Sequence, residues 1–341
     1  MNFGRTRLLL LSVLALMALS VACGGDDDGD AAAVVTLILS PSPNANHAGV
    51  YLAQQKGYFT EENLTVNIEF SADPESAMRA VGAETKDFVI GNQLTLLKLR
   101  DEEVSVMGIA AITQHALHGI VAPASAGVEN PLDLVGMKVG YPGTTNSERF
   151  LNTMLVSDGA NGTQDVELVS FESGLTEALL NGTVDAIMSP DWPHAQAEAD
   201  NQGQPVTVLR FKGWSLPEHY EHMLVTSERN FKKRENLVRR FTRAIRRGYE
   251  DALADPQGGI DALQAGTTEK IDETLERAAA DLLAPLWAPF RPIRGSRVAL
   301  IGDQDVNVYL TLIRWMRDNK LVGSVVHYST AYHNKFSLIE E

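Results

Sequence analysis

The amino-acid sequence predicts an α/β fold in which mostly parallel sheets are flanked by helices. Short apolar runs alternate with helical stretches along most of the chain, as they do in sheets built from strand–helix–strand units. The composition points the same way, because 44% hydrophobic and 21% charged residues are typical of a soluble globular protein. The length of 341 residues allows one large domain or two ordinary ones.

The first strand–helix unit opens the expected fold. An apolar run at 34–39 predicts a buried strand, prolines and asparagines then break the chain, and a helical pattern ends near Gly57. The loop at 41–47 therefore precedes a helix N-terminus. Free backbone N–H groups and the positive end of the helix dipole face a ligand there.

Further strands and helices follow in alternation. Strands are expected at 65–70, 86–91, 104–112, 117–122, 137–141, 166–169, 184–188, 206–211 and 221–226. Helices are expected after Asp73 and at 94–100, 148–158, 174–181, 237–253, 260–283 and 306–317. The helix at 237–253 carries five arginines that are expected on a solvated face, with a partner contact as the alternative: Arg239, Arg240, Arg243, Arg246 and Arg247.

The N-terminus has the features of a targeting segment. Two arginines precede an apolar run at 8–19, which is too short for a comfortable transmembrane helix. Cys23 is the only cysteine, so no disulfide can form within the chain. The pattern resembles a bacterial lipoprotein signal, with a signal peptide at 1–22, lipidation of Cys23 and a flexible acidic tether at 23–33. The alternative is an ordinary secretory signal with a chance cysteine.

The charge and the motifs exclude some functions. The chain has 44 acidic and 29 basic residues, a formal charge of −15. An acidic surface repels a polyanion, so nucleic acid is not expected as a partner. The sequence shows no Ser-His-Asp signature, phosphate-binding glycine loop or paired catalytic carboxylates in motif form.

The stretch at 44–66, NxxHAGVYLAQQKGYFxEENLxV, resembles the opening of substrate-binding proteins of ABC importers. The resemblance is to the branch that includes binders of sulfonates and of thiamine pyrimidine precursors. Asn44 and the step from His47 to Gly49 are most similar to the hydroxymethylpyrimidine-type binders. The segments AxxLLAPLW and AYHNKFSL extend the resemblance over about 34–338.

This resemblance implies the two-lobed periplasmic-binding-protein type II fold with two hinge crossings. Lobe I would be 34–119 plus 221–341, and lobe II would be 120–220. The protein would be an extracytoplasmic monomer, held to the membrane by its lipid, that binds a small molecule between the lobes and docks on an ABC permease. The resemblance implies no enzyme activity, no cofactor and no covalent chemistry.

Loops at the carboxyl ends of the predicted strands are the expected ligand site. They are rich in neutral polar and aromatic residues, which favours a flat, mostly uncharged ligand. Trp192 and Tyr141 are candidates for stacking on a ring, and Asn44 and His47 match the family motif. Packing for the aromatic residues and helix capping for Asn44 and His47 are the alternatives. The full candidate set is Asn44, His47, Asp73, Asn92, Gln114, Tyr141, Thr144, Asp191 and Trp192.

The expected ligand is a thiamine-type pyrimidine precursor, on resemblance alone. Where pyrimidine binders tend to show YWNWE, this chain has DWPHA at 191–195, which keeps one tryptophan and loses the glutamate. A sulfonate, nitrate or other small nitrogenous ligand is the alternative, although a sulfonate should favour Arg or Lys in the loops. A pyrimidine synthase of the same fold is the enzyme alternative. The stretch at 214–225 lacks the cysteines of its CCCFC motif.

No metal site is expected from the histidines. His115 and His118 lie three apart on a predicted strand turn, which points their side chains to opposite faces. His219 and His222 have the same spacing at a crossing, with no third ligand evident in the sequence.

Overall fold

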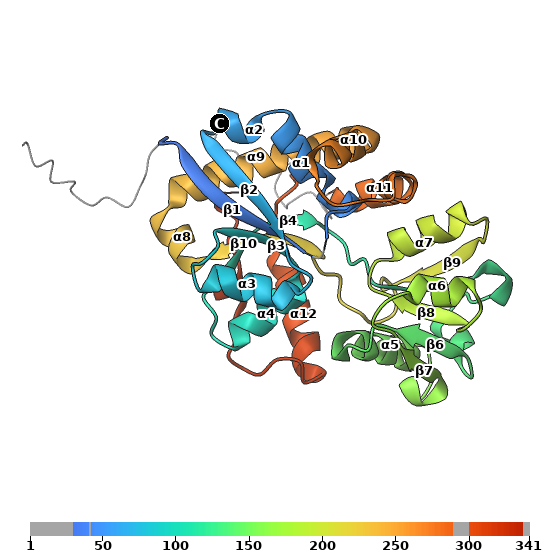
Figure 1. Ribbon diagram of the computed structural model, residues 1–341. Coiled ribbons are helices and arrows are strands. Elements are labelled where there is room, and N and C mark those ends of the chain that lie inside the picture. The colour runs from blue at the N-terminus through green and yellow to red at the C-terminus, as the bar shows by residue number, and fades with distance from the viewer. Residues whose placement is uncertain (1–29, 41, 289–299, 337–341) are drawn as a thin grey trace, which may run out of the picture.

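The computed structural model describes residues 30–40, 42–288 and 300–336. The expected signal peptide at 1–22 and the expected lipidation site Cys23 lie outside the described residues. The described chain forms two α/β bodies side by side, each built on one five-stranded sheet (Figure 1). Within the same residues, no helix is long and apolar enough to cross a membrane.

The first sheet has the strand order β2-β1-β3-β10-β4. Its antiparallel member is β10 (His222–Ser227), which pairs with β3 and β4. The other four strands share one direction: β1 (Ala33–Leu39), β2 (Leu64–Phe70), β3 (Phe88–Gly91) and β4 (Val106–Thr113). In the register, Leu37 of β1 lies opposite Ile68 of β2 and Phe88 of β3.

The second sheet repeats this plan with the order β7-β6-β8-β5-β9. Its antiparallel member is β5 (Gly119–Pro123), which pairs with β8 and β9. The other four strands are β6 (Lys138–Tyr141), β7 (Glu167–Ser170), β8 (Ala186–Ser189) and β9 (Val206–Arg210). All ten strands expected from apolar runs are present, and both sheets are mostly parallel as predicted.

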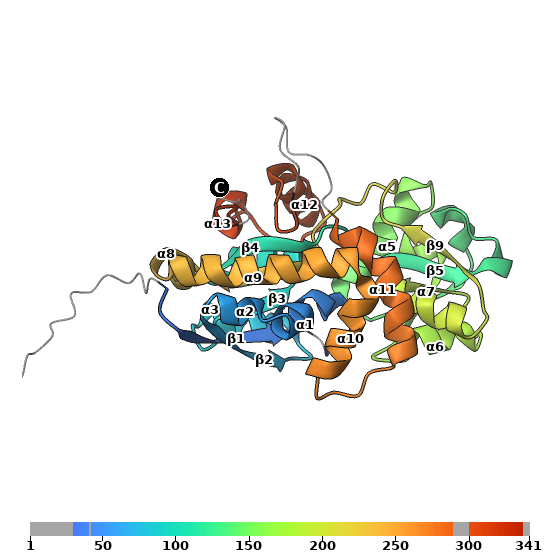
Figure 2. The same cartoon turned by 90° about the horizontal axis from the view of Figure 1, so that it is seen from above.

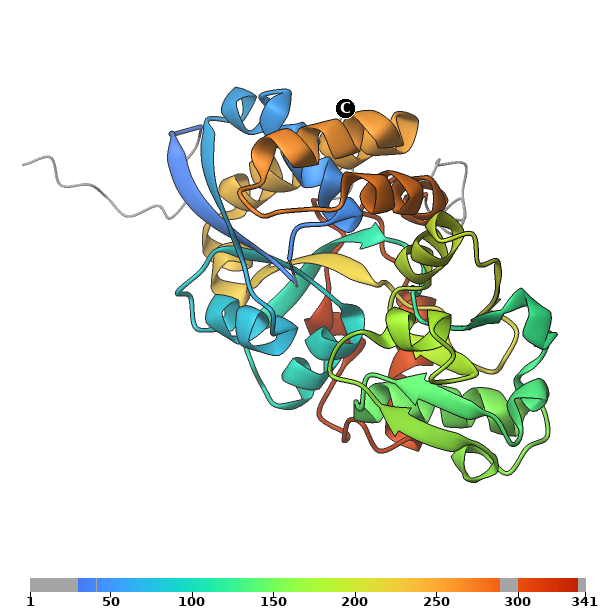
Figure 3. The same cartoon turned by 45° about the vertical axis from the view of Figure 1, so that its right-hand side comes forward.

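The chain passes between the two sheets twice (Figure 3). Residues 114–118 connect β4 to β5, and residues 211–221 connect β9 to β10. Each crossing therefore leads directly into the antiparallel strand of the sheet that it enters. We call the body around the first sheet lobe I and the body around the second sheet lobe II.

Helices cover both faces of the first sheet. One face packs on α1 (Ala48–Gln55) and α9 (Glu235–Ala254), which runs along the lobe (Figure 2). The other packs on α3 (Pro74–Gly82), α4 (Gln93–Asp101) and α12 (Val306–Asp318). Side chains alternate along a strand, so Leu37 and Leu39 of β1 join the first core and Ile38 joins the second.

The remaining helices complete the two lobes. Lobe I also holds α2 (Tyr58–Glu61), α8 (Glu228–Lys233), α10 (Pro256–Gly266), α11 (Glu273–Trp287), α13 (Tyr328–Ala331) and the 3₁₀ helix η1 (Ala45–His47). Lobe II holds α5 (Thr145–Ser157), α6 (Leu175–Leu180), α7 (Trp192–Asn201) and the 3₁₀ helices η2 (Ala124–Ala126), η3 (Pro131–Leu134) and η4 (Thr163–Asp165).

Two expectations for the long helices are wrong. The helix expected at 260–283 is two helices, because α10 ends at Gly266 and the side chain of Asp272 caps a new helix by accepting from the N–H of Thr274. Arg240 does not lie on a solvated face. It is 2% exposed and donates to the carbonyls of Glu62 and Ala31, so α9 holds the chain just before β1 and β2.

The two lobes touch through α12 and α5. The indole of Trp315 stacks on Phe150 with ring centroids 4.9 Å apart, and its Nε1–H donates to Oγ1 of Thr153 at 3.3 Å. Both Trp315 and Trp287 are buried. A second contact between the lobes, at η1, α7 and α11, contains the polar residues described next.

Candidate functional site

Two helix N-termini from different lobes meet at the carboxyl ends of their sheets. In lobe I the chain leaves β1 and enters η1, and in lobe II it leaves β8 and enters α7. The amide of Asn46 donates from Nδ2 to Oδ2 of Asp191 at 3.0 Å, which joins the two N-termini directly. Asp191 also accepts from the backbone N–H of His194, so it caps α7 and reaches across to lobe I.

His194 lies between two carboxylates, one from each lobe. Its Nδ1 is 2.9 Å from Oδ2 of Asp191 and its Nε2 is 3.1 Å from Oε2 of Glu276 on α11. Burial opposes the charged imidazole, but the charges and hydrogen bonds of Asp191 and Glu276 raise the pKa of His194 to about 10. Burial likewise opposes the charged Asp191, and the charge of His194 lowers its pKa below the usual value. The group thus holds one cation between two carboxylates.

Glu276 ties this group into lobe I. The carboxylate is buried and accepts from the backbone N–H of Ala45 at 2.6 Å. Ala45 is the first residue of η1, so the helix N–H groups and His194 share the same carboxylate. The sequence predicted that this helix N-terminus faces a ligand. In the structure the carboxylate of Glu276 lies there.

His47 is fully buried and neutral. Burial lowers its pKa to about 3, with further lowering from the charges of His222 and His194. Its Nδ1 accepts from the backbone N–H of Asn44 at 3.3 Å, so the hydrogen of the neutral ring lies on Nε2. The ring packs edge-on against His222, whose pKa is lowered by burial and whose Nδ1 lies 3.0 Å from Oγ1 of Thr113.

Three buried N–H donors in this region find no acceptor among the described residues. They are Nε2 of His47, Nε1 of Trp192 and Nε1 of Trp287. They come from the ends of η1, α7 and α11, and η1 and α7 each contact α11. A buried donor without a partner costs about 1–3 kcal/mol, so a ligand that brings acceptors would stabilise these elements.

Trp192 is a buried residue with one ring face already covered. It is 1% exposed, and the guanidinium of Arg210 on β9 lies 4.1 Å from the ring centroid. Burial lowers the pKa of Arg210. The backbone N–H of Trp192 donates to the carbonyl of Leu117 on the first crossing, which fixes the start of α7 against the hinge.

The structure places the other candidate residues mainly in structural roles. The side chains of Asn44, Asp73, Asn92 and Thr144 accept backbone N–H groups at the starts of η1, α3, α4 and α5. Gln114 is buried and donates to the carbonyls of Ala111 and Asp303. Tyr141 is half-buried at the end of β6 and packs on the core of lobe II. Of the nine candidates, Asn44, His47, Asp191 and Trp192 lie on the two loops that meet.

Four residues of this group were not among the sequence candidates: Asn46, His194, His222 and Glu276. Asn46 and His194 lie in the loops after the predicted strands at 34–39 and 184–188. The sequence therefore predicted these loops as part of the site but did not single out these two side chains. Glu276 lies on α11, a segment that the sequence marked only as helix. It has no local pattern that separates it from other acidic helix residues.

A surface pocket of about 320 Å³ lies away from this group. It opens where the chain enters β3 and at α8, at the opposite end of β3 from Asn92. Its charges are paired, with Arg229 2.9 Å from Glu84 and Arg234 2.9 Å from Asp87. The lining residues are Glu84, Lys86, Asp87, Arg229, Asn230, Lys233 and Arg234, which suit a charged surface better than a flat uncharged ligand.

Among the described residues, one group of three has the composition of a metal site. It is His118, His219 and Glu221, whose candidate ligand atoms all lie within 4.8 Å of one another. The two crossings contribute these residues, one histidine from each.

A family model described as NMT1/THI5 like matches residues 44–258. The formylaminopyrimidine-binding protein of Halalkalibacterium halodurans is 26% identical over 312 residues, which cover 90% of this chain and 91% of that protein. The riboflavin-binding protein RibY of Chloroflexus aurantiacus is 24% identical, with 89% and 85% covered. A 4-amino-5-hydroxymethyl-2-methylpyrimidine phosphate synthase of Aspergillus parasiticus is 22% identical, with 67% and 69% covered.

The fold also has solved counterparts. The alkanesulfonate-binding protein SsuA of Xanthomonas axonopodis superposes with a TM-score of 0.63 at 13% identity, covering 89% of this chain and 98% of that one. At this identity the likeness shows the fold alone. It is the two-domain periplasmic-binding-protein fold that the sequence predicted.

Proposed function

The chain belongs to the NMT1/THI5-like family, and on that premise we propose that it is the extracytoplasmic substrate-binding protein of an ABC importer. Its ligand is a small aromatic nitrogen compound, of the class of thiamine pyrimidine precursors. The ligand lies between the lobes, at the group formed by η1, α7 and α11. A relative aligned over nine-tenths of both chains, the formylaminopyrimidine-binding protein, supports this ligand class.

The observation that carries the proposal is the polar bridge between the lobes. Asn46 reaches Asp191, and His194 joins Asp191 to Glu276, so side chains of both lobes form one network. Such a network assembles only when the lobes come together. Binding proteins of this design use that closure to signal occupancy to a permease.

The chemistry of the group fits an aminopyrimidine. Ring nitrogens accept hydrogen bonds, and the buried N–H donors of His47, Trp192 and Trp287 lack acceptors among the described residues. An exocyclic amine donates, and the carboxylates of Asp191 and Glu276 accept. His47 of the 44–47 loop thus serves the ligand class that the family motif implies, while Asn44 caps η1.

The same chemistry disfavours a sulfonate or nitrate. The one cationic residue within the network, His194, is already matched by two carboxylates. Arg210 is engaged on the ring of Trp192. An anion placed here would meet Asp191 and Glu276 without a free cation to offset them.

The chain binds its ligand without transforming it. Two relatives aligned over about nine-tenths of this chain are named as binding proteins. The synthase of the same family is the alternative, and its cysteine-rich motif has no cysteine here at 214–225. Incubation with the pyrimidine followed by mass analysis discriminates the two: consumption of the ligand contradicts a pure binding role.

The anchor and the organisation belong to the same proposal. Cys23 is lipidated after removal of 1–22, the acidic stretch at 23–33 is the tether, and the protein works as a monomer at the outer face of the cytoplasmic membrane or in the periplasm. The lobes comprise 34–119 plus 221–341, and 120–220. Mass spectrometry of the N-terminal peptide from membranes tests the anchor: an unmodified Cys23 contradicts it.

Thermal melting with a ligand panel tests the function. The panel contains aminopyrimidines, riboflavin, thiamine, taurine and nitrate. A ligand that binds only the folded state adds about 2.7 kcal/mol at a hundredfold excess over its Kd. We expect a rise in Tm with aminopyrimidines that Trp192→Ala abolishes and Arg229→Ala, at the charged pocket, preserves. A rise with taurine or nitrate alone would overturn the ligand class.

A further inference from the structure

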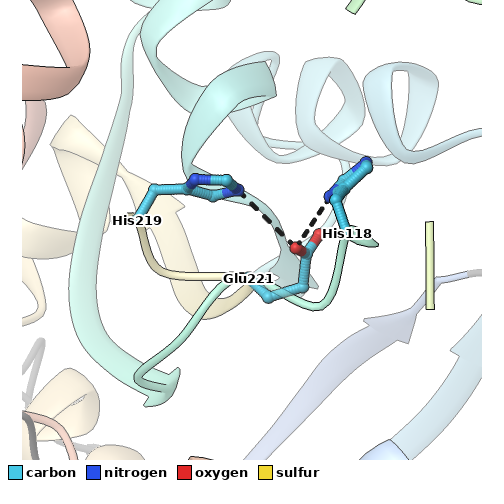
Figure 4. A group of neighbouring side chains, drawn as sticks. All are labelled: His118, His219 and Glu221. Atoms are coloured by element: carbon cyan, nitrogen blue, oxygen red, sulfur yellow. Dashed lines mark hydrogen bonds and ion pairs between the residues drawn. The ribbon is translucent and has the colours of Figure 1, made fainter. Parts of the chain in front are cut away.

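We propose that the hinge carries a binding site for a divalent transition metal of the Zn²⁺ class, formed by His118, His219 and Glu221. This site is separate from the ligand group and does not depend on the proposed function. Figure 4 shows the three side chains turned toward one another. His118 is the last residue of the first crossing, and His219 and Glu221 end the second, so one ion would join both connections between the lobes.

Two of the three distances between the ligand atoms are close to those of a tetrahedral zinc site. Nδ1 of His118 lies 3.2 Å and Nε2 of His219 lies 3.6 Å from Oε2 of Glu221. Ligands about 2.0–2.2 Å from a tetrahedral ion are about 3.3–3.6 Å apart from one another. The two histidine nitrogens here lie within 4.8 Å of each other. Two histidines and one glutamate are also a known zinc ligand set, which leaves the fourth position for water.

The hydrogen bonding of His219 leaves one ring nitrogen, Nε2, available to bind a cation. Its Nδ1 lies 3.2 Å from the carbonyl of Pro217 and must donate to it, because a carbonyl only accepts. A backbone carbonyl that holds the far nitrogen of a ligating histidine is a recurrent feature of metal sites. In the neutral ring Nε2 then carries a lone pair, is fully buried, and has no hydrogen-bond partner among the described residues. It faces the carboxylate of Glu221, so a cation, either a proton or a metal ion, belongs between the two groups.

The carboxylate of Glu221 is held in place by both crossings. Its Oε2 accepts from the backbone N–H of Leu117 at 3.0 Å, which fixes it against the first crossing. Glu221 itself ends the second crossing, so the carboxylate lies where the two connections meet.

Aromatic rings hold the two histidines in these positions. His219 stacks on Phe150 with an interplanar angle of 7° and centroids 5.8 Å apart. His118 packs against Phe150 at 5.1 Å and Phe211 at 5.7 Å. Both phenylalanines are buried. The side chain of His118 is 13% exposed, which leaves a route for the ion from solvent.

Zinc binding to the purified chain, after chelator treatment and without any pyrimidine, tests the site. We expect one Zn²⁺ per chain in competition with a fluorescent chelator, and Co²⁺ in its place should show the intense visible bands of tetrahedral coordination. His118→Gln and His219→Asn should each weaken binding by at least about tenfold. His115→Gln is the matched control, because His115 lies on the same crossing and pairs with Glu218.

Three results would overturn the proposal. They are no saturable Zn²⁺ binding, equal binding by the parent and both cluster variants, and an equal loss in the His115 control. If His219→Asn does not fold, the partly exposed His118→Gln decides the matter alone. Since no ligand is present, a failure of metal binding leaves the proposed pyrimidine function untouched.

Discussion

Asn46 and Asp191 form a hydrogen bond between the lobes, with Nδ2 of Asn46 3.0 Å from Oδ2 of Asp191. The two residues are 145 positions apart in the chain. Asn46 lies in η1 and Asp191 is the N-cap of α7, each at the carboxyl end of its own sheet, so the bond brings the predicted binding loops of both lobes together. The backbone of Asn46 is held as well, since the hydroxyl of Tyr249 donates to its carbonyl at 2.8 Å.

The variant Asn46→Asp should open the two lobes. The substitution keeps the shape of the side chain and replaces the amide donor with a carboxylate that faces Asp191. Like charges at hydrogen-bonding distance in a partly buried place repel one another. We expect a larger radius of gyration by small-angle X-ray scattering and weaker ligand binding, with the fold retained by circular dichroism.

The matched control for Asn46→Asp is Asn92→Asp. This substitution also introduces a carboxylate, but at the cap of α4 within lobe I, where a carboxylate oxygen can still accept the backbone N–H. Its scattering curve should match that of the parent chain. An unchanged radius in Asn46→Asp, or an equal increase in Asn92→Asp, would contradict the role of the Asn46–Asp191 bond.

The stability of the chain should depend on pH through two histidines with opposite shifts. The pKa of His194 is raised from 6.5 to about 10 by Asp191 and Glu276, against the effect of burial. The folded state then holds a proton that the unfolded state releases, so this stabilisation is complete below pH 6.5 and is lost toward pH 10. The pKa of His47 is lowered to about 3, chiefly by burial, so the unfolded state takes up a proton first and stability falls from pH 6.5 toward pH 3.

Melting curves of the unliganded chain across this range check the two contributions separately. His194→Gln should lower Tm most below pH 6.5 and flatten the loss of stability above pH 6.5. His47→Gln should flatten the loss below pH 6.5 and leave the alkaline side unchanged. Equal slopes in the parent and both variants would show that these two rings do not set the pH dependence.

The sequence predicted those parts of the site that depend on neighbours along the chain. Helix capping was the alternative role for Asn44, and its Oδ1 does accept from the backbone N–H of Asn46, because capping involves residues two or three positions apart. The partner of His194 could not be predicted in the same way. Glu276 is 82 residues further along, and only the packing of α11 on α7 brings the two together.

The hinge cluster illustrates the same limit. In the sequence, the histidines form two pairs spaced by three, one pair at each crossing. Neither pair alone predicts a metal site. The structure combines one histidine of each pair, because both crossings enter antiparallel strands at the same boundary between the sheets. Whether residues of the two crossings meet depends on how the chain connects the two sheets, and no local sequence pattern reveals it.

Arg240 gives the last prediction, because the helix pattern placed it among solvated arginines and the structure buries it. Its guanidinium donates to two backbone carbonyls, those of Glu62 and Ala31, at the entrances to β2 and β1. Arg240→Ala leaves both carbonyls without this donor and removes the packing of the side-chain stem. Hydrogen bonds from a charged donor contribute about 1.5–3 kcal/mol each, so we expect a loss of about 3–6 kcal/mol in the free energy of unfolding, measured by chemical denaturation.

Arg247→Ala on the same helix is the matched control. The guanidinium of Arg247 lies on the ring of Tyr58 and pairs with Glu61 at 2.5 Å, and both charged side chains are well exposed. Exposed ion pairs contribute about 0–1 kcal/mol because solvent screens them. Equal losses of unfolding free energy in the two variants would show that the buried hydrogen bonds of Arg240 contribute no more stability than an exposed ion pair.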